Sequence, residues 1–283
     1  MLSYRHAFHA GNYADVVKHL TISLILESLS KKDNAFCYLD SHAGTAIYNL
    51  DSEFARKTGE FKEGIELLWK LQEKELPTAI KPYMDAIRAV NQGEKLNSYL
   101  GSPAIAQYFA RPQDSLSLME LHPKDYQLLR TQYKKQRRIN VYNRDGFEVL
   151  KALIPPPQKR GLVLIDPAYE LKSDYTKVVE TVKIIHKRWA TGIYALWYPI
   201  LKQRSFQDTL YRKMQKSGIK NILQIELTRY SSNTPRGMYG TGMLVINPPY
   251  QLEQTLKELL PWLWQLLSPK AEGGWRVEWL VPE

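Results

Sequence analysis

The chain has 283 residues, of which 44% are hydrophobic and 11% aromatic, so it can bury a sizeable core in one large or two small domains. Its 39 Lys and Arg residues outnumber 29 Asp and Glu residues, and the formal net charge of +10 indicates a polyanionic partner, with nucleic acid as the leading candidate. The sequence has no apolar stretch of 18 residues and no apolar signal-peptide core at its start, which argues against a membrane protein.

A polar segment opens the chain, with histidines at His6 and His9 and a third at His19. This spacing could suggest a metal site, but no cysteine or pair of acidic residues completes a ligand set, so no metal is predicted. A contact with a cofactor or with RNA is the favoured interpretation, and a solvated surface is the alternative.

The first predicted strand, at 35–39, contains Cys37, the only cysteine of the chain. An internal disulfide is therefore impossible, which fits a reducing cytoplasm, and a thiol inside a buried strand is too inert to act as a nucleophile. Residues 40–46 follow, where Rossmann-like folds place a tight turn that lets a cofactor approach closely. Gly44 is the one glycine of this turn and is assigned to the cofactor site, although a single glycine is a weak motif.

A long surplus of residues separates Asp40 from the next acidic strand end, at Glu120. Dinucleotide-type folds place the corresponding acidic residue roughly 20 positions after the glycine turn. We therefore predict a small helical subdomain at 53–100, inserted between the first and second strands of a single domain that spans 1–283. Its role is open: it either packs on the core or recognises a large substrate. Its two apolar stripes are Phe61, Ile65, Leu68 and Trp69, and Ile80, Tyr83, Met84 and Ile87.

Acidic residues stand at the ends of four successive predicted strands. They are Asp40, Glu120, Asp145 and Asp166, at the ends of the runs at 35–39, 116–121, 139–142 and 162–165. In open α/β sheets, ligands bind at the carboxyl ends of the strands. Glu120 can accept hydrogen bonds from both ribose hydroxyls, and Asp145, next to Gly146, can accept one from an adenine amine. Such an acidic rim suits S-adenosylmethionine, which carries no phosphate, better than it suits NAD with its pyrophosphate.

Residues 166–169, Asp-Pro-Ala-Tyr, are the most informative segment of the chain. The exocyclic amine of adenine is a poor nucleophile because its lone pair is delocalised into the ring. Asp166 and the carbonyl of Pro167 can each accept one amine hydrogen and free that lone pair, while Tyr169 can stack on the base. The segment resembles the (D/N)PP(Y/F/W) motif of N6-adenine methyltransferases, with Ala168 in place of the second proline. The alternative is a strand that ends in an Asp-Pro turn without chemistry.

The remaining elements complete a doubly wound α/β pattern, a Rossmann-like parallel sheet. Further strands are predicted at 192–197, 219–227 and 242–246, the last two as a terminal antiparallel pair, and helices at 123–135, 174–189, 203–217 and 251–267. Asn247 begins a second motif, Asn-Pro-Pro-Tyr, that matches the methyltransferase pattern more literally. The order of the strands nevertheless favours Asp166, because Asp145 and Asp166 end neighbouring strands, and we interpret Asn247 as the end of an edge strand.

Two basic groups are candidates for an RNA contact. We interpret the run of Lys134, Lys135, Arg137 and Arg138 as a solvated helix end. We predict instead that Arg229, Tyr230 and Arg236, in the loop of the final strand pair, grip RNA beside Asp166.

Several segments together resemble the ribosomal RNA large subunit methyltransferase J family over nearly the whole chain, the insertion included. They are residues 4–19, 40–48, 101–103, 119–123, 143–147 and 166–175. The resemblance implies a class I methyltransferase that transfers a methyl group from S-adenosylmethionine to N6 of one adenine in 23S rRNA, with that adenine extruded into the site. No membrane partner is predicted, and no obligate protein partner is inferred. The resemblance implies Asp166 as the catalytic acceptor and Tyr4 as an RNA contact. The implied cofactor contacts are His19, His42, Ser102, Glu120, Asp145, Gly146 and Asp166.

Two rival functions remain. A metal-dependent nuclease, or another protein that acts on external DNA, would use Asp166, Glu170 and Lys172. Two carboxylates only four residues apart on a turn do not converge on one metal, and such an enzyme would need Mg²⁺ rather than S-adenosylmethionine. A non-catalytic RNA-binding assembly factor fits the basic charge, but it would leave the acidic strand ends without a role and would show no cofactor affinity.

Overall fold

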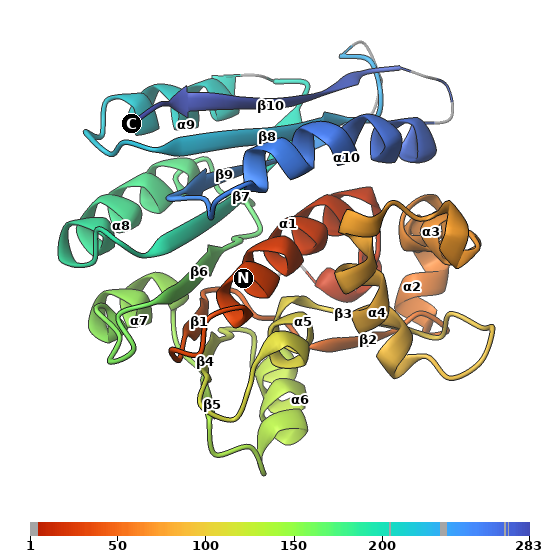
Figure 1. The fold of residues 1–283 in the computed structure, drawn as a ribbon, viewed down its shortest axis with the longest axis horizontal. Coiled ribbons are helices and arrows are strands. Elements are labelled where there is room, and N and C mark those ends of the chain that lie inside the picture. Colours follow the sequence, from red (N-terminus) through yellow and green to blue (C-terminus); the bar gives the residue numbers. More distant parts are fainter. Residues whose placement is uncertain (1–4, 204, 233–236, 269, 271) are drawn as a thin grey trace.

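The computed structural model describes residues 5–203, 205–232, 237–268, 270 and 272–283 (Figure 1). These residues form an eight-stranded sheet in the order β10-β8-β9-β7-β6-β1-β4-β5. The strands from β7 to β5 are parallel, and β9, β8 and β10 each pair in antiparallel fashion. The strands are β1 (Cys37–Asp40), β4 (Ser115–Met119), β5 (Ile139–Tyr142), β6 (Gly161–Ile165), β7 (Ile193–Leu201), β8 (Ile222–Thr228), β9 (Met238–Ile246) and β10 (Gly274–Val281).

Helices cover both faces of this sheet because successive residues of a central strand point to opposite faces and both sets are apolar. Leu162 and Leu164 of β6 belong to one core cluster, whereas Val163 and Ile165 belong to the other. The first cluster is covered by α1 (Tyr13–Ser30), α5 (Ser102–Phe109), α6 (Pro123–Tyr133) and α10 (Leu252–Leu267). The second is covered by α7 (Gly146–Leu153), α8 (Asp174–Arg188) and α9 (Ser205–Gln215), which line the left side of Figure 1.

The predicted fold class is confirmed, including the antiparallel pairing of β8 with β9. That pair does not end the sheet, however, because β10 lies outside β8 at the edge. The sequence patterns also missed α1, in which the residues from Tyr13 to Leu26 are all buried. A helix that is buried on every side has no polar stripe, so its periodicity is hard to detect. None of the helices among the described residues is long and apolar enough to cross a membrane.

The insertion begins and ends at a short two-stranded sheet of β2 (Ile47–Asn49) and β3 (Ser98–Leu100). Between them lie α2 (Glu53–Thr58), η2 (Glu60–Glu63), α3 (Ile65–Trp69), η3 (Glu73–Glu75), η4 (Thr78–Ile80) and α4 (Lys81–Val90). Ile65, Tyr83 and Met84 are fully buried in the core cluster that also contains α1. The insertion therefore packs on the main core, and its definition as a subdomain of a single domain stays a prediction.

Candidate active site

A cavity of about 730 Å³ lies at the carboxyl edge of the parallel strands. Its size falls within the range of about 300–1,000 Å³ that small-molecule sites occupy. All the described residues assigned to catalysis or cofactor binding from the sequence line it: His19, His42, Gly44, Ser102, Glu120, Asp145, Gly146, Asp166, Pro167 and Tyr169. Tyr4, assigned to RNA, and Arg236 lie outside the described residues. The structure thus brings together residues that follow β1, β4, β5 and β6 of the main sheet with Ser102 at the start of α5 and His19 of α1, and their individual roles stay predictions.

Register explains this convergence. Asp40 pairs with Leu118 on one side and Leu164 on the other, so β1, β4 and β6 end at nearly the same level. Glu120 and Asp166 lie one or two positions beyond the paired residues. Asp40 itself is fully buried beneath the cavity, where it accepts hydrogen bonds from Ser102 Oγ at 2.6 Å and from the Tyr38 hydroxyl at 2.7 Å. Burial raises the pKa of Asp40 to about 6.

The turn after β1 and the end of β4 form the floor of the cavity. Glu120 accepts hydrogen bonds from the backbone N–H of Gly44 at 2.8 Å and of His122 at 2.6 Å. Burial nevertheless raises its pKa. Each carboxylate oxygen accepts one of these bonds and keeps a further lone pair. Glu120 can therefore still accept a hydrogen bond from each of two ribose hydroxyls.

The end of β5 supplies Asp145 and Gly146 at the start of α7. Asp145 caps this helix by accepting a hydrogen bond from Phe147 N at 2.8 Å, and it pairs with Lys177 Nζ at 2.9 Å. Burial opposes its ionisation, but Lys177 and the helix N–H groups outweigh burial and lower the pKa of Asp145. A Cβ atom at Gly146 would lie 1.9 Å from the carbonyl oxygen of Ser41, so only glycine fits where α7 meets the β1 turn.

Two histidines of the cavity are uncharged at neutral pH. Burial lowers the pKa of His42 to about 4 and holds that of His19 well below its usual range. His19 Nδ1 lies 2.7 Å from the hydroxyl of Tyr99, and the His42 ring meets Phe147 edge to face. Among the described residues no three His, Cys, Asp or Glu side chains form a group that could hold a metal ion.

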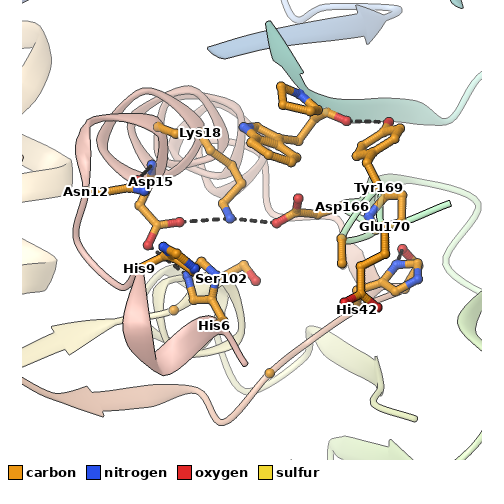
Figure 2. Close-up of a pocket in the computed structure, with 18 of the residues that line it drawn as sticks. His6, His9, Asn12, Asp15, Lys18, His42, Ser102, Asp166, Tyr169 and Glu170 are labelled. Atoms are coloured by element: carbon orange, nitrogen blue, oxygen red, sulfur yellow. Dashed lines mark hydrogen bonds and ion pairs between the residues drawn. The ribbon is translucent and has the colours of Figure 1, made fainter. Parts of the chain in front are cut away.

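Asp166, the predicted catalytic acceptor, belongs to an ion pair that the sequence did not predict. Lys18 of α1 lies between two carboxylates, with its Nζ 2.6 Å from Asp166 Oδ2 and 2.9 Å from Asp15 Oδ1 (Figure 2). Its side chain is only 5% exposed, and that of Asp15 is 2% exposed. Burial opposes the charge on Lys18, but the two carboxylates outweigh it and raise the pKa of Lys18. The available signal was a lysine three positions after an aspartate in the apolar first half of that helix.

Tyr169 is held by its surroundings in an unusual backbone conformation. Its φ of 51° lies in the left-handed region, which costs energy for a residue with a side chain and persists where the fold fixes it. The Tyr169 hydroxyl donates to the carbonyl of Trp197 at 2.7 Å, and its ring centroid lies 4.4 Å from that of Tyr175. The ring is therefore fixed at the cavity wall, one residue beyond the exposed Ala168.

The rival motif at Asn247 lies elsewhere. Because β9 runs antiparallel to β7, its last residue, Ile246, pairs with Tyr194 near the start of β7. Asn247 is therefore at the opposite edge of the sheet from Asp166. Its amide nitrogen donates to the carbonyls of Ala190 and Gly192 at 2.8 Å each, and it does not line the cavity.

A second part of the cavity wall links the insertion to the segment before α1 and to the residue that follows β8. Glu60 of η2 accepts a hydrogen bond from Asn12 Nδ2 at 3.0 Å and lies 2.9 Å from His9 Nδ1, and Glu63 pairs with Arg229 at 2.8 Å. Arg229, after β8, lines the same cavity as Asp166, as the predicted RNA contact requires, but it is buried and already paired. This wall was not foreseen, because its members are separated by about 50 to 170 positions along the chain.

Known proteins resemble this chain over its full length. The family model described as "RsmJ: Ribosomal RNA large subunit methyltransferase D, RlmJ" matches residues 33–281. Two proteins named ribosomal RNA large subunit methyltransferase J are 50% identical over 283 residues, from Escherichia coli (strain K12), and 47% identical over 284 residues, from Haemophilus influenzae, with complete coverage of both chains in each case.

A solved structure agrees with this. The crystal structure of a protein from Legionella pneumophila is 36% identical, covers 96% of this chain and 98% of its own, and superposes with a TM-score of 0.88. A probable spermidine synthase from Corynebacterium glutamicum superposes with a TM-score of 0.51 over 88% of this chain and 77% of its own. Because the two are only 11% identical, this likeness shows the fold alone. The chain therefore belongs to the ribosomal RNA large subunit methyltransferase D (RlmJ) family and is a methyltransferase.

Proposed function

We propose that the protein transfers a methyl group from S-adenosylmethionine to N6 of a specific adenine in 23S rRNA. The relatives named above act, by their names, on ribosomal RNA of the large subunit. The observation that carries the finer proposal is Asp166, anchored by Lys18 at the cavity rim beside Tyr169.

The cavity floor fits S-adenosylmethionine, which supplies an electrophilic methyl group on a sulfonium. Glu120 would accept hydrogen bonds from the ribose hydroxyls, and Asp145 would face the adenine amine. Gly146 lets the start of α7 lie directly against the β1 turn at the edge of the cavity, because a Cβ atom there would clash with the carbonyl of Ser41. The uncharged His19 and His42 add no positive charge that would repel a sulfonium.

The target adenine would lie against Asp166, Pro167 and Tyr169. Asp166 and the carbonyl of Pro167 accept the two amine hydrogens, which draws the nitrogen toward a tetrahedral geometry. The N6–methyl bond would form as the bond between the methyl group and sulfur breaks, so the positive charge would pass from sulfur to N6, and N6 would then lose one proton to solvent. Lys18 fixes the Asp166 carboxylate and Tyr169 presents a preorganised stacking surface, so neither group must reorganise during the reaction.

The test is transfer of radiolabelled methyl groups to rRNA that lacks the modification, followed by identification of the labelled nucleoside. We expect N6-methyladenosine and no label in other bases. Label in another nucleoside would refute the assignment of the target atom. RNA cleavage that needs Mg²⁺, without any label, would favour a nuclease, and tight RNA binding without label or cofactor affinity would favour an assembly factor.

A further inference from the structure

The positive charge of the protein is concentrated in one stretch of the chain. Residues 171–220 hold 11 of the 39 Lys and Arg residues but only 3 of the 29 Asp and Glu residues, which gives a net charge of +8. The rest of the chain, with 28 basic and 26 acidic residues, carries only +2. Nearly the whole excess of charge therefore belongs to α8, β7, α9 and the segments that join them.

Most of these basic residues form one surface, which we call the α8–α9 basic face. The helices α8 and α9 pack against each other on the same side of the sheet (Figure 1). Their buried residues face the second core cluster, so the opposite side of each helix faces solvent. With 15 residues, α8 is about 22 Å long, enough to follow several phosphates of a nucleic-acid strand. The face comprises the exposed Lys172, Lys177, Lys183, Lys187, Arg212 and Lys216 and the half-buried Lys213.

This face begins at the rim of the active-site cavity. Lys177, in the first turns of α8, lines the cavity and pairs with Asp145. A row of aromatic rings connects the catalytic motif to both helices, since Tyr175 lies 4.4 Å from Tyr169 and 5.6 Å from Phe206 between ring centroids. A nucleotide beside Tyr169 would therefore have its flanking strand next to the basic face.

Other surfaces suit a long polyanion less well. The insertion at 53–100 holds eight basic and eight acidic residues, so its net charge is zero. Arg229 is buried and already paired with Glu63, so it offers little charge to a long strand. The run at 134–138 follows α6 beside β5, the edge strand that lies four positions from β7 in the sheet.

We propose that the α8–α9 basic face binds the phosphate backbone of the rRNA segment that flanks the target adenine. The inference rests on the proposed function and adds to it the surface that carries most of the electrostatic affinity for RNA. Each phosphate contact releases bound counterions, so the affinity of this face falls steeply with salt.

The experiment compares two variants that each remove four exposed positive charges. The test variant combines Lys183→Gln, Lys187→Gln, Arg212→Gln and Lys216→Gln, and the matched control combines Arg130→Gln, Lys134→Gln, Lys135→Gln and Arg137→Gln near the far edge. RNA affinity is measured against salt concentration with an unmodified rRNA fragment. Steady-state methylation is measured on that fragment and on a short single-stranded oligonucleotide that contains adenine.

In the test variant we expect the slope of log affinity against log salt concentration to be shallower by about 0.9 for each phosphate that is no longer neutralised. We also expect a raised KM for the long fragment and an unchanged kcat. S-adenosylmethionine affinity and KM for the short oligonucleotide should match the wild type, and the control should match it throughout. If the melting temperature of the test variant shifts, two double variants replace it. One combines Lys183→Gln with Lys187→Gln, and the other combines Arg212→Gln with Lys216→Gln.

Two outcomes overturn the inference while the function stands: wild-type slopes in the test variant, or an equal reduction of slope in the control. Absence of methyl transfer by the wild type would instead overturn the proposed function. The wild-type measurement alone therefore separates failure of the proposed function from failure of this inference.

Discussion

Replacement of Asp166 by alanine is the sharpest test of the catalytic assignment. The change removes a carboxylate that would accept one amine hydrogen in the transition state. Loss of one preorganised hydrogen-bond partner of this kind lowers turnover by about 10²–10³-fold, or about 2.7–4 kcal/mol. The protein should remain folded, because Lys18 keeps Asp15 as a partner at 2.9 Å and the Asp166 side chain lies at the rim, 14% exposed.

The assay is single-turnover methyl transfer with saturating cofactor and RNA, accompanied by calorimetric titration of S-adenosylmethionine. We expect cofactor affinity to persist, because the ribose and adenine contacts lie at neighbouring strand ends. Asp166→Asn retains one oxygen acceptor and should keep more activity than Asp166→Ala. Asn247→Ala, at the opposite edge of the sheet, is the matched control and should behave as the wild type. Turnover of Asp166→Ala within a few-fold of the wild type would refute the reasoning.

Three further changes probe the surrounding site. Glu120→Ala should weaken S-adenosylmethionine binding by about 2–3 kcal/mol, typical of charge-assisted hydrogen bonds, and an unchanged affinity by calorimetry would place the ribose elsewhere. Lys18→Met leaves buried carboxylates without their cation and should lower the free energy of unfolding by about 3–5 kcal/mol in urea titrations, and a wild-type midpoint would contradict the described ion pair. Glu60 raises the pKa of His9 by a hydrogen bond, so this pair adds stability that is fully present below the ordinary histidine pKa of about 6.5 and is lost as pH rises through the higher folded value. Glu60→Gln should therefore reduce the change in stability with pH between the ordinary and the raised pKa of His9. If the melting temperature of this variant varies with pH as that of the wild type does, the linkage is excluded.

The edge of the sheet that carries the cavity could be predicted from the sequence because parallel strands end at one side of a sheet. Four acidic residues after four apolar runs are a local pattern, and the fold places three of them in the cavity and Asp40 just beneath it. Asn247 could be rejected only by strand order, and the structure gives the physical reason, which is the reversed direction of β9.

The contacts that complete the site depend on tertiary packing and left no local signal. Lys18 and Asp166 are 148 positions apart, and Arg229 and Glu63 are 166 apart. The helix that carries Lys18 was missed because burial on all sides removes the amphipathic period. The basic face was missed for a different reason: its charges are scattered over 50 residues, whereas the compact run at 134–138 is conspicuous in the sequence.

The two glutamates of η2 have a consequence for how the protein can be altered. Glu60 contacts residues 9 and 12 near the start of the chain. Glu63 pairs with Arg229, which lies more than 200 positions after those two residues. An insertion between two strands, which looks dispensable in the sequence, thus contacts both the segment before α1 and the residue that follows β8. A shortened protein with a minimal loop in its place would keep every acidic strand end, yet its cavity would lose the wall that Glu60 and Glu63 form and their contacts with His9, Asn12 and Arg229.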